Sequence, residues 1–215
     1  MKLFLLMIAA TIGLCYGVIN KTNFISKKPQ KAVVAKSPVK ETLSNTYVYE
    51  RLKTKVVLAK QFVQKNNFNT QYCFLIDMTV PSGKNRFFVY NLQQDSLVYE
   101  ALVTHGSGSL TSTSDLKFSN IVGSNATSIG KYKIGEQYYG KFGLAYKLHG
   151  LDASNSNAFK RAVVLHAHPL VPNEPTYPQP ICTSWGCPTV SPAFLQQLKK
   201  CIDENNKPIL LWIYY

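Results

Sequence analysis

The chain has 215 residues, of which 46% are hydrophobic and 16% are charged, and its formal net charge is +13 at pH 7. This length is enough to bury the core of one domain, and after the first residues no segment approaches the roughly 20 apolar residues that span a bilayer. The charge is uneven, because residues 18–60 carry ten Lys or Arg against two acids, and residues 61–215 carry thirteen against nine. The basic excess therefore belongs to the N-terminal arm, and we expect no nucleic-acid partner for the domain.

Residues 1–17 have the order of a secretory signal peptide. Lys2 precedes an apolar run from Leu3 to Leu14, and Cys15 and Gly17 occupy the two positions that a signal peptidase reads. About a dozen apolar residues are too few to span a bilayer, which favours cleavage after Gly17 over a membrane anchor. We therefore expect export to the periplasm or cell envelope.

Residues 18–45 are rich in Lys, Ser, Thr and Pro and have no sustained apolar period, which indicates a basic flexible tether. Two interpretations of its charge stay open in an exported protein. The tether is a solvated linker kept extended by like charges, or it makes a weak contact with an anionic wall or membrane surface. Residues 46–215 remain as one domain.

The elements predicted in this domain are mostly strands. Apolar positions near helical spacing predict a short helix over 54–67, and Ser191 as an N-cap before Pro192 predicts a second helix over 192–205. This pattern of many strands, with one helix before the sheet and one near the C-terminus, indicates an α+β domain with a mainly β core. Alternating or β-branched runs predict strands, the first two joined as a hairpin, over 72–80, 86–92, 97–104, 131–134, 144–149, 162–166 and 208–215.

Residues 105–130 are predicted to form surface loops, because they are rich in Gly, Ser and Thr and hold little that builds a core. Long ordered loops in a compact domain often carry function. The sequence shows no internal repeat.

Cys187 is the candidate nucleophile. Its neighbour Gly186 permits an unusual backbone conformation and the close approach of a substrate, and Pro188 fixes the chain just after the thiol. Catalysis by a thiol needs N–H donors for the oxyanion, and the amides of Gly186 and Cys187 are placed to face one point. The same pattern also fits an ordinary turn around a buried thiol.

The base must come from another part of the chain. An apolar strand ends in His166, and His168 follows two residues later on the same face. A histidine at the end of a strand, where the chain opens into a loop, is well placed to accept a proton at neutral pH. We expect His105 and His149 to be structural on the basis of their local sequence alone.

A strand that ends in His, about twenty residues, and then Ser-x-Gly-Cys resembles the catalytic signature of the L,D-transpeptidase (YkuD-like) catalytic-domain family. The form Ser-Trp-Gly-Cys-Pro is similar to the murein L,D-transpeptidase branch of that family. Further blocks extend the resemblance over roughly residues 70–195, and several ordered blocks are more specific than one tetrapeptide. These blocks include Val103-Thr104-His105-Gly106, Ser128-Ile129-Gly130-Lys131-Tyr132, Tyr138-Tyr139-Gly140-Lys141 and Lys147-Leu148-His149-Gly150-Leu151.

The resemblance implies an L,D-transpeptidase-like β-sandwich that transfers acyl groups between peptidoglycan stem peptides, with no metal and no organic cofactor. In this reaction Cys187 forms a thioester with a stem peptide and D-alanine leaves, and His166 moves the proton. The turn and the oxyanion site are assigned to Ser184, Trp185 and Gly186. The substrate-binding residues that we expect are His168, His149 and Gly150.

The sequence departs from the family pattern at three positions. Trp185 stands where the wider family has His, so if that imidazole orients the substrate, His168 or His149 must replace it. Ala167 replaces the Gly that usually follows the first histidine, and Thr183 stands where the branch often has Arg. These changes bear on substrate preference more than on the chemistry.

Two other functions remain open at this point. A secreted cysteine peptidase or amidase would use the same Cys187 and His166. A non-catalytic module that binds the cell wall would hold Cys187 inert, for example in a disulfide with Cys182, five residues away. No paired Cys or His spacing supports a structural zinc site.

Overall fold

The computed structural model describes residues 38–113, 115–204 and 206–215. The predicted signal peptide (1–17) and residues 18–37 of the predicted tether lie outside the described residues. The helices are α1 (Pro38–Lys65) and α2 (Pro192–Asp203), with short 3-10 turns at Ser107–Ser109 (η1) and Ala153–Asn155 (η2). The strands are β1 (Tyr72–Asp77), β2 (Phe87–Asn91), β3 (Ser96–Ala101), β4 (Gly130–Gly140), β5 (Gly143–Gly150), β6 (Val164–Ala167), β7 (Thr189–Val190) and β8 (Leu210–Tyr214).

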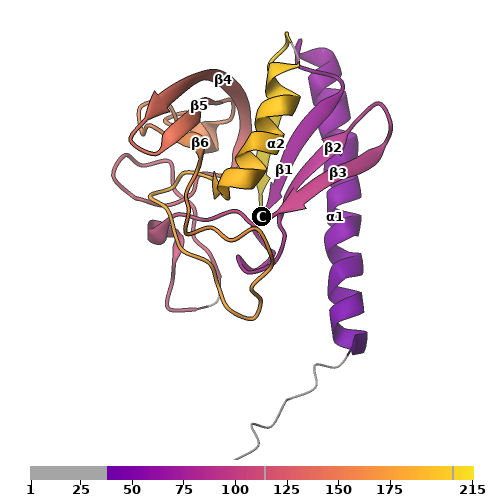
Figure 1. The fold of residues 1–215 in the computed structure, drawn as a ribbon, viewed down its shortest axis with the longest axis vertical. Helices are drawn as coiled ribbons and strands as arrows, with labels where there is room; N and C mark the ends of the chain where they lie inside the picture. The colour runs from indigo at the N-terminus through magenta and orange to yellow at the C-terminus, as the bar shows by residue number, and fades with distance from the viewer. Residues whose placement is uncertain (1–37, 114, 205) are drawn as a thin grey trace, which may run out of the picture. The chain divides into compact units, whose positions relative to one another are not determined.

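The eight strands of the described residues form one mixed sheet in the order β3-β2-β1-β8-β4-β5-β6-β7. β1 pairs with β2 in the predicted antiparallel hairpin, and its other edge pairs in parallel with β8. In Figure 1, α2 lies between the part of the sheet that contains β1–β3 and the part that contains β4–β6. The predicted α+β class is confirmed, with one helix before the sheet and one near the C-terminus.

β1 explains how the two helices are held on the sheet. Phe74 and Ile76 belong to the main core, which α2 joins through Phe194, Leu195 and Leu198. Cys73 and Leu75 point to the other face, where they pack in a second cluster with residues of α1. A strand that is covered on both faces usually has a nearly continuous run of apolar residues, and the sequence of β1 is of this kind. The residues of α1 in the second cluster are Leu52, Val56, Ala59 and Val63.

α2 begins as predicted. The side chain of Ser191 accepts a hydrogen bond from the amide of Phe194, and Pro192 occupies the first turn. α1, in contrast, starts at Pro38 and not at residue 54, so residues 38–45 of the predicted tether are helical. The residues of α1 that are buried in the second cluster begin at Leu52, and Val48 packs against the same cluster one turn earlier.

β4 is also longer than predicted. It continues from the predicted strand over 131–134 to Gly140, and the chain then turns through Lys141 and Phe142 into β5. Residues 136–140 are exposed, so no buried face imposes an alternating apolar pattern on this part of the strand. The β4–β5 turn matters for the site because it carries Phe142.

A buried ion pair joins α1 to the end of β1. The Nε of Arg51 lies 2.9 Å from Oδ2 of Asp77, and the side chain of Asp77 is fully buried while that of Arg51 is a quarter exposed. The carboxylate also accepts from the backbone amide and the hydroxyl of Thr79. Charged groups this deeply buried need partners, and Asp77 has both an opposite charge and hydrogen-bond donors.

We predict that Asp77→Ala lowers the free energy of unfolding by about 3 kcal/mol, because it leaves Arg51 without its buried partner. Lys53→Ala removes one side of the exposed ion pair with Glu50 and should cost less than about 1 kcal/mol. Urea denaturation followed by circular dichroism measures both values. Equal, small losses in the two variants would contradict the role assigned to Asp77.

Candidate active site

The short parallel pairing of β6 with β7 brings the two predicted catalytic side chains together. His166 of β6 is the register partner of Thr189 in β7, and Cys187 lies two residues before Thr189. Cys187 and His166 both line a cavity of about 210 Å³. The structure thus places the candidate nucleophile and the candidate base in one cavity, although 20 residues separate them in the chain.

The turn that carries Cys187 is held by hydroxyl groups. The Ser184 hydroxyl donates to the carbonyl oxygen of Cys187 at 2.6 Å, and the Thr104 hydroxyl donates to the same oxygen at 3.2 Å. Ser184 is itself fixed on the 105–130 loop, because its amide donates to the carbonyl of His105 and its carbonyl accepts from the amide of Ser107. Hydrogen bonds therefore hold the backbone of this turn at the carbonyl of Cys187 and at the backbone of Ser184.

Gly186 has a φ of +108°, a conformation that side chains rarely adopt. A Cβ at this position would lie 2.8 Å from the carbonyl oxygen of Ala126 and 3.2 Å from Nη2 of Arg161. The turn therefore requires glycine for conformation and for space.

The oxyanion donors differ from the sequence-based expectation. The amide of Gly186, expected to face the substrate together with that of Cys187, donates instead to the hydroxyl of Ser184 at 3.2 Å. The amide of Cys187 has no acceptor among the described residues. Of the two expected amides, only that of Cys187 is available to an incoming carbonyl oxygen in this arrangement.

The thiol of Cys187 sits against the backbone of β6. Its Sγ accepts from the amide of Val164 at 3.5 Å and donates to the carbonyl of Ala162 at 3.7 Å, a residue with a strained φ of +52°. Burial raises the pKa of the Cys187 thiol, and the Val164 amide and the charge of Arg161 lower it by smaller amounts. The neutral thiol therefore predominates at pH 7 in this environment.

The imidazole of His166 is fixed through both nitrogens. Nδ1 lies 3.0 Å from the carbonyl oxygen of Ala167, which only accepts, so Nδ1 carries the proton of the neutral ring. Nε2 is then the basic nitrogen, and it accepts from the Thr189 hydroxyl at 3.0 Å. Burial lowers the pKa of His166; the bond to Ala167 raises it, and the neighbouring His168 lowers it further. His166 is thus neutral at pH 7 and able to accept a proton.

Phe142 contributes to the burial of the imidazole. Its ring stacks on that of His166 with centroids 5.3 Å apart and an interplanar angle of 25°, and it meets the ring of His168 edge-on at 5.7 Å. Phe142 is half exposed itself, so it forms the outer wall of the cavity. The exposed side chains of Trp185 and Leu170 complete this apolar rim.

The structure divides the predicted substrate-binding residues into two groups. His168 lines the cavity, as do Ser184 and Trp185 of the turn. His149 and Gly150 do not, because β5 carries them away from the cavity: His149 stacks on Phe159, and Gly150 packs against the backbone of Asn155. The substrate-binding role expected for these two residues stays a prediction.

Four residues of the site were not singled out by sequence reasoning: Thr104, Phe142, Arg161 and Thr189. The sequence could have indicated Thr189 as a site residue, because it lies two residues after Cys187 and residues two apart share one face of an extended segment. The others reach the site through tertiary contacts that have no local pattern. Arg161, for example, holds the loop beneath the turn by donating to the carbonyl oxygens of Ser119 and Ala126.

Cys182 also lines the cavity, but it is not joined to Cys187. Among the described residues, Cys182 and Cys187 are both free thiols. The disulfide that would have made the nucleophile inert is absent from this structure. Cys73 and Cys201 are buried in the core, so reagents that reach a thiol in the folded protein will meet the cavity cysteines first.

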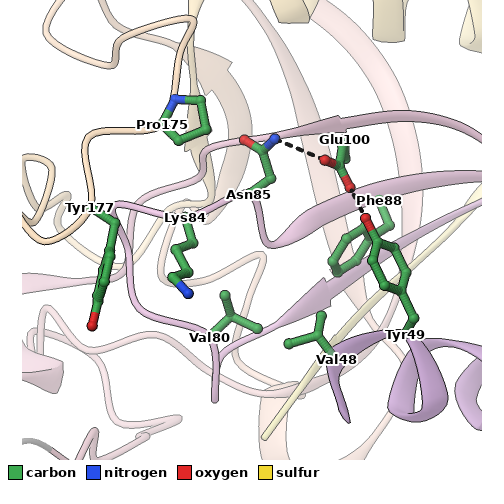
Figure 2. A pocket seen from close by; sticks show the side chains of 9 residues that line it. All are labelled: Val48, Tyr49, Val80, Lys84, Asn85, Phe88, Glu100, Pro175 and Tyr177. Carbon is green, nitrogen blue, oxygen red and sulfur yellow. Dashed lines mark hydrogen bonds between the residues drawn. The ribbon is translucent and has the colours of Figure 1, made fainter. Parts of the chain in front are cut away.

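A second hollow, of about 240 Å³, lies between α1, the β2–β3 region and the segment around Tyr177 (Figure 2). Its carboxylate, Glu100, already accepts from the hydroxyl of Tyr49 and the side-chain amide of Asn85. The Lys84 ammonium lies over the ring of Tyr177, 4.5 Å from its centroid. This hollow contains neither a thiol nor an imidazole, whereas the Cys187 cavity contains both. The Cys187 cavity is therefore our candidate active site.

A thiol and a neutral imidazole in one cavity, on a mainly β domain, define a candidate cysteine enzyme. The model of the L,D-transpeptidase catalytic domain matches residues 43–214, and the chain therefore belongs to this family. The family resemblance given by the sequence is confirmed at this level. No curated protein sequence matches the chain.

Solved structures with some similarity to the chain include three bacterial proteins. The helical cell shape determining protein Pgp2 from Campylobacter jejuni has 15% identity and a TM-score of 0.42, and the match covers 66% of this chain and 46% of that one. Bd1075 from Bdellovibrio bacteriovorus has 16% identity, a TM-score of 0.42 and coverages of 69% and 49%. An L,D-transpeptidase from Mycobacterium smegmatis has 10% identity, a TM-score of 0.40 and coverages of 67% and 59%. The chain thus spans about half the length of these proteins.

We predict that Gly186→Ala slows the alkylation of Cys187 and lowers the free energy of unfolding by about 2 kcal/mol, since it adds a clash to an unfavourable φ. Gly123 is the matched control: its φ is +80°, but a Cβ there meets no atom within 4 Å. Gly123→Ala should cost about 1 kcal/mol and leave the alkylation rate unchanged. Iodoacetamide kinetics and urea denaturation measure the two effects. The same alkylation rate in both variants would contradict the steric requirement at Gly186.

Proposed function

We propose that this protein is a cysteine acyltransferase that acts on peptidoglycan stem peptides, with Cys187 as nucleophile and His166 as base. One observation carries the proposal: the Cys187 thiol and the imidazole of His166, with Nε2 as its basic nitrogen, line the same cavity. Membership in the L,D-transpeptidase catalytic domain family supports the substrate class. The Ser-Trp-Gly-Cys-Pro form of the motif further suggests the murein L,D-transpeptidase branch.

The proposed reaction begins with transfer of the thiol proton of Cys187 to Nε2 of His166. The thiolate attacks the carbonyl carbon of the third residue in a tetrapeptide stem, and a C–S bond forms. The amide of Cys187 donates to the oxygen that becomes negative, and loss of one such donor typically slows a reaction by about 100-fold or more. His166 then returns the proton to the departing amine of D-alanine, which leaves a thioester on Cys187.

The thioester has two possible acceptors. Attack by an amine of a neighbouring stem gives an L,D-cross-link, and attack by water gives a trimmed tripeptide. The apolar rim formed by Phe142, Leu170 and Trp185 supports transfer to an amine, because it limits the access of water to the cavity. A secreted cysteine peptidase or amidase would use the same two residues with water as the acceptor.

The proposed place of action is the cell envelope. The signal-peptide pattern over residues 1–17 supports export, and the family acts on the cell wall. In the part of the chain that the structure describes, no helix is long and apolar enough to cross a membrane. The basic tether ahead of the domain would then lie near anionic wall polymers or lipid head groups.

We predict that Cys187→Ala abolishes turnover of a tetrapeptide muropeptide and leaves the fold intact, because it removes only a small group at the cavity. His166→Ala should lower the rate by at least about 100-fold, which is within the usual contribution of a general base. Mass spectrometry of the products detects either a cross-linked dimer or the loss of one D-alanine, and circular dichroism controls for folding.

Activity that survives in Cys187→Ala would refute the assignment of the nucleophile. A loss of less than about tenfold in His166→Ala would point to His168 as the base, because it lines the same cavity. Thiol labelling of the untreated, folded protein separates the enzyme from a non-catalytic module. A module with a blocked Cys187 would be labelled only after reduction.

A further inference from the structure

His105 belongs to a block of the sequence that separates two cavities. Its neighbour Thr104 lines the Cys187 cavity, whereas His105 lines a cavity of about 490 Å³ together with Arg86 and Ser82. The two cavities share no lining residue. The exposed fractions of the three side chains are 1% for Arg86, 6% for His105 and 6% for Ser82. The volume of this second cavity is in the range of sites for small organic ligands.

Arg86 is a buried cation whose hydrogen-bond partners are all uncharged. Its Nε and Nη2 donate to the carbonyl oxygen of Val103 at 3.0 and 2.8 Å, and Nη1 donates to that of Val80 at 3.0 Å. Nη2 also lies 3.0 Å from Nδ1 of His105. Burial lowers the pKa of Arg86 to about 9 and the charge of Asp77 raises it, so the guanidinium is charged at pH 7. These four bonds use four of its five N–H groups and do not offset its charge.

The carboxylates in this region have other partners. Asp77 forms its ion pair with Arg51. Asp115 lines the same cavity as Arg86, but its side chain is exposed and accepts from the hydroxyl of Tyr215 at 3.5 Å. Among the described residues, neither carboxylate forms an ion pair with Arg86. The buried part of the cavity therefore has one positive charge without a paired negative one.

His105 provides a donor at the same place. The guanidinium of Arg86 carries only donors, so Nδ1 of His105 accepts and Nε2 carries the proton of the neutral ring. Burial and then the charge of Arg86 lower the pKa of His105 to about 4, which keeps the ring neutral at pH 7. Nε2 has no acceptor among the described residues, and a buried N–H without an acceptor is rare and costs free energy. Ser82 adds a hydroxyl, which accepts from the amide of Ile181 at 3.3 Å and keeps its own proton to donate.

We propose that this second cavity binds the carboxylate of a small organic acid, with Arg86, His105 and Ser82 as the donors. A carboxylate only accepts hydrogen bonds, so it supplies the acceptor that Nε2 of His105 lacks and offsets the charge of Arg86. A phosphate dianion fits less well, because the site has a single cation and Asp115 lies on the same cavity. The volume leaves room for the body of the acid as well as for its carboxylate.

The test follows the histidine side chains by nitrogen-15 NMR in the full chain. The chain has four histidines, so the His105 signals are assigned by elimination from the variants His149→Gln, His166→Gln and His168→Gln. Titration with N-acetylalanine should shift the Nε2–H signal of His105 until it saturates, because a carboxylate oxygen accepts from this group. The uncharged amide of N-acetylalanine should leave the signal in place. His166 and His168 are internal controls, since both line the Cys187 cavity.

Two substitutions of buried serines form a matched pair. Ser82→Ala removes one donor and should weaken the binding of N-acetylalanine about three- to tenfold. The buried hydroxyl of Ser109 likewise accepts a backbone amide, that of Thr127, but Ser109 does not line the cavity, so Ser109→Ala should leave the affinity unchanged. Arg86→Gln removes the positive charge and should weaken binding by about tenfold or more. Ser82→Ala decides the result if Arg86→Gln does not fold.

A saturating shift of His105 with N-acetylalanine and not with its amide, weakened by Ser82→Ala, would support the carboxylate site. Equal shifts with the amide, tighter binding of inorganic phosphate, or shifts confined to His166 and His168 would overturn it. An unchanged His105 signal would do the same. The measurement needs no turnover, so an inactive protein that binds N-acetylalanine at His105 would reject acyl transfer and retain this site.

Discussion

The parallel pairing of β6 with β7 is the contact on which the site depends. It is only two residues long, with His166 opposite Thr189 and Ala167 opposite Val190. β7 leads directly into α2 through the Ser191 cap, and α2 is held in the main core. The position of the thiol relative to the imidazole is therefore set by a rigid helix and a central sheet, although both side chains lie at the ends of strands.

The loop over residues 105–130 packs against the turn that carries Cys187. Gly106 pairs with Ser184, and a Cβ on Gly106 would lie 2.9 Å from the Cα of Gly186, so the two backbones are in close contact. Arg161, which lies just before β6, donates a hydrogen bond to the Ser119 carbonyl in the same loop. Its positive charge also favours the thiolate form of Cys187. The Gly- and Ser-rich composition of this loop thus has a structural reason, since larger residues would push the turn and the nucleophile apart.

The buried environment leaves the nucleophile and the base uncharged before reaction. It raises the pKa of the Cys187 thiol and lowers that of His166, and both effects come mainly from desolvation. The thiol is consequently protected from indiscriminate reaction. A proton must pass from Cys187 to His166 as the substrate is attacked. The Ala167 carbonyl at Nδ1 leaves Nε2 as the basic nitrogen, and Nε2 must exchange its hydrogen bond with the Thr189 hydroxyl for that proton.

The sequence predicted the fold class, the hairpin, α2 and its cap, because each of these has a local pattern of apolar spacing, capping or turn residues. It did not predict the first turns of α1, the exposed end of β4 or the two residues of β7. The end of β4 has no buried face, and β7 is too short to show a period. Of the site, Cys187, His166, Ser184 and His168 follow from motif and strand position. The environment of Nε2 and the engaged amide of Gly186 depend on contacts between distant segments, and so does the position of His149 and Gly150 outside the Cys187 cavity.

The proposed reaction requires that Cys187 take up an acyl group from a stem peptide. The most direct measurement is the intact mass of the protein after incubation with a tetrapeptide donor and no acceptor amine, followed by peptide mapping. We expect an adduct equal to the donor less D-alanine, located on Cys187 and absent from the His166→Gln variant. An adduct on Cys182, or an unmodified protein after prolonged incubation with the donor, would contradict it.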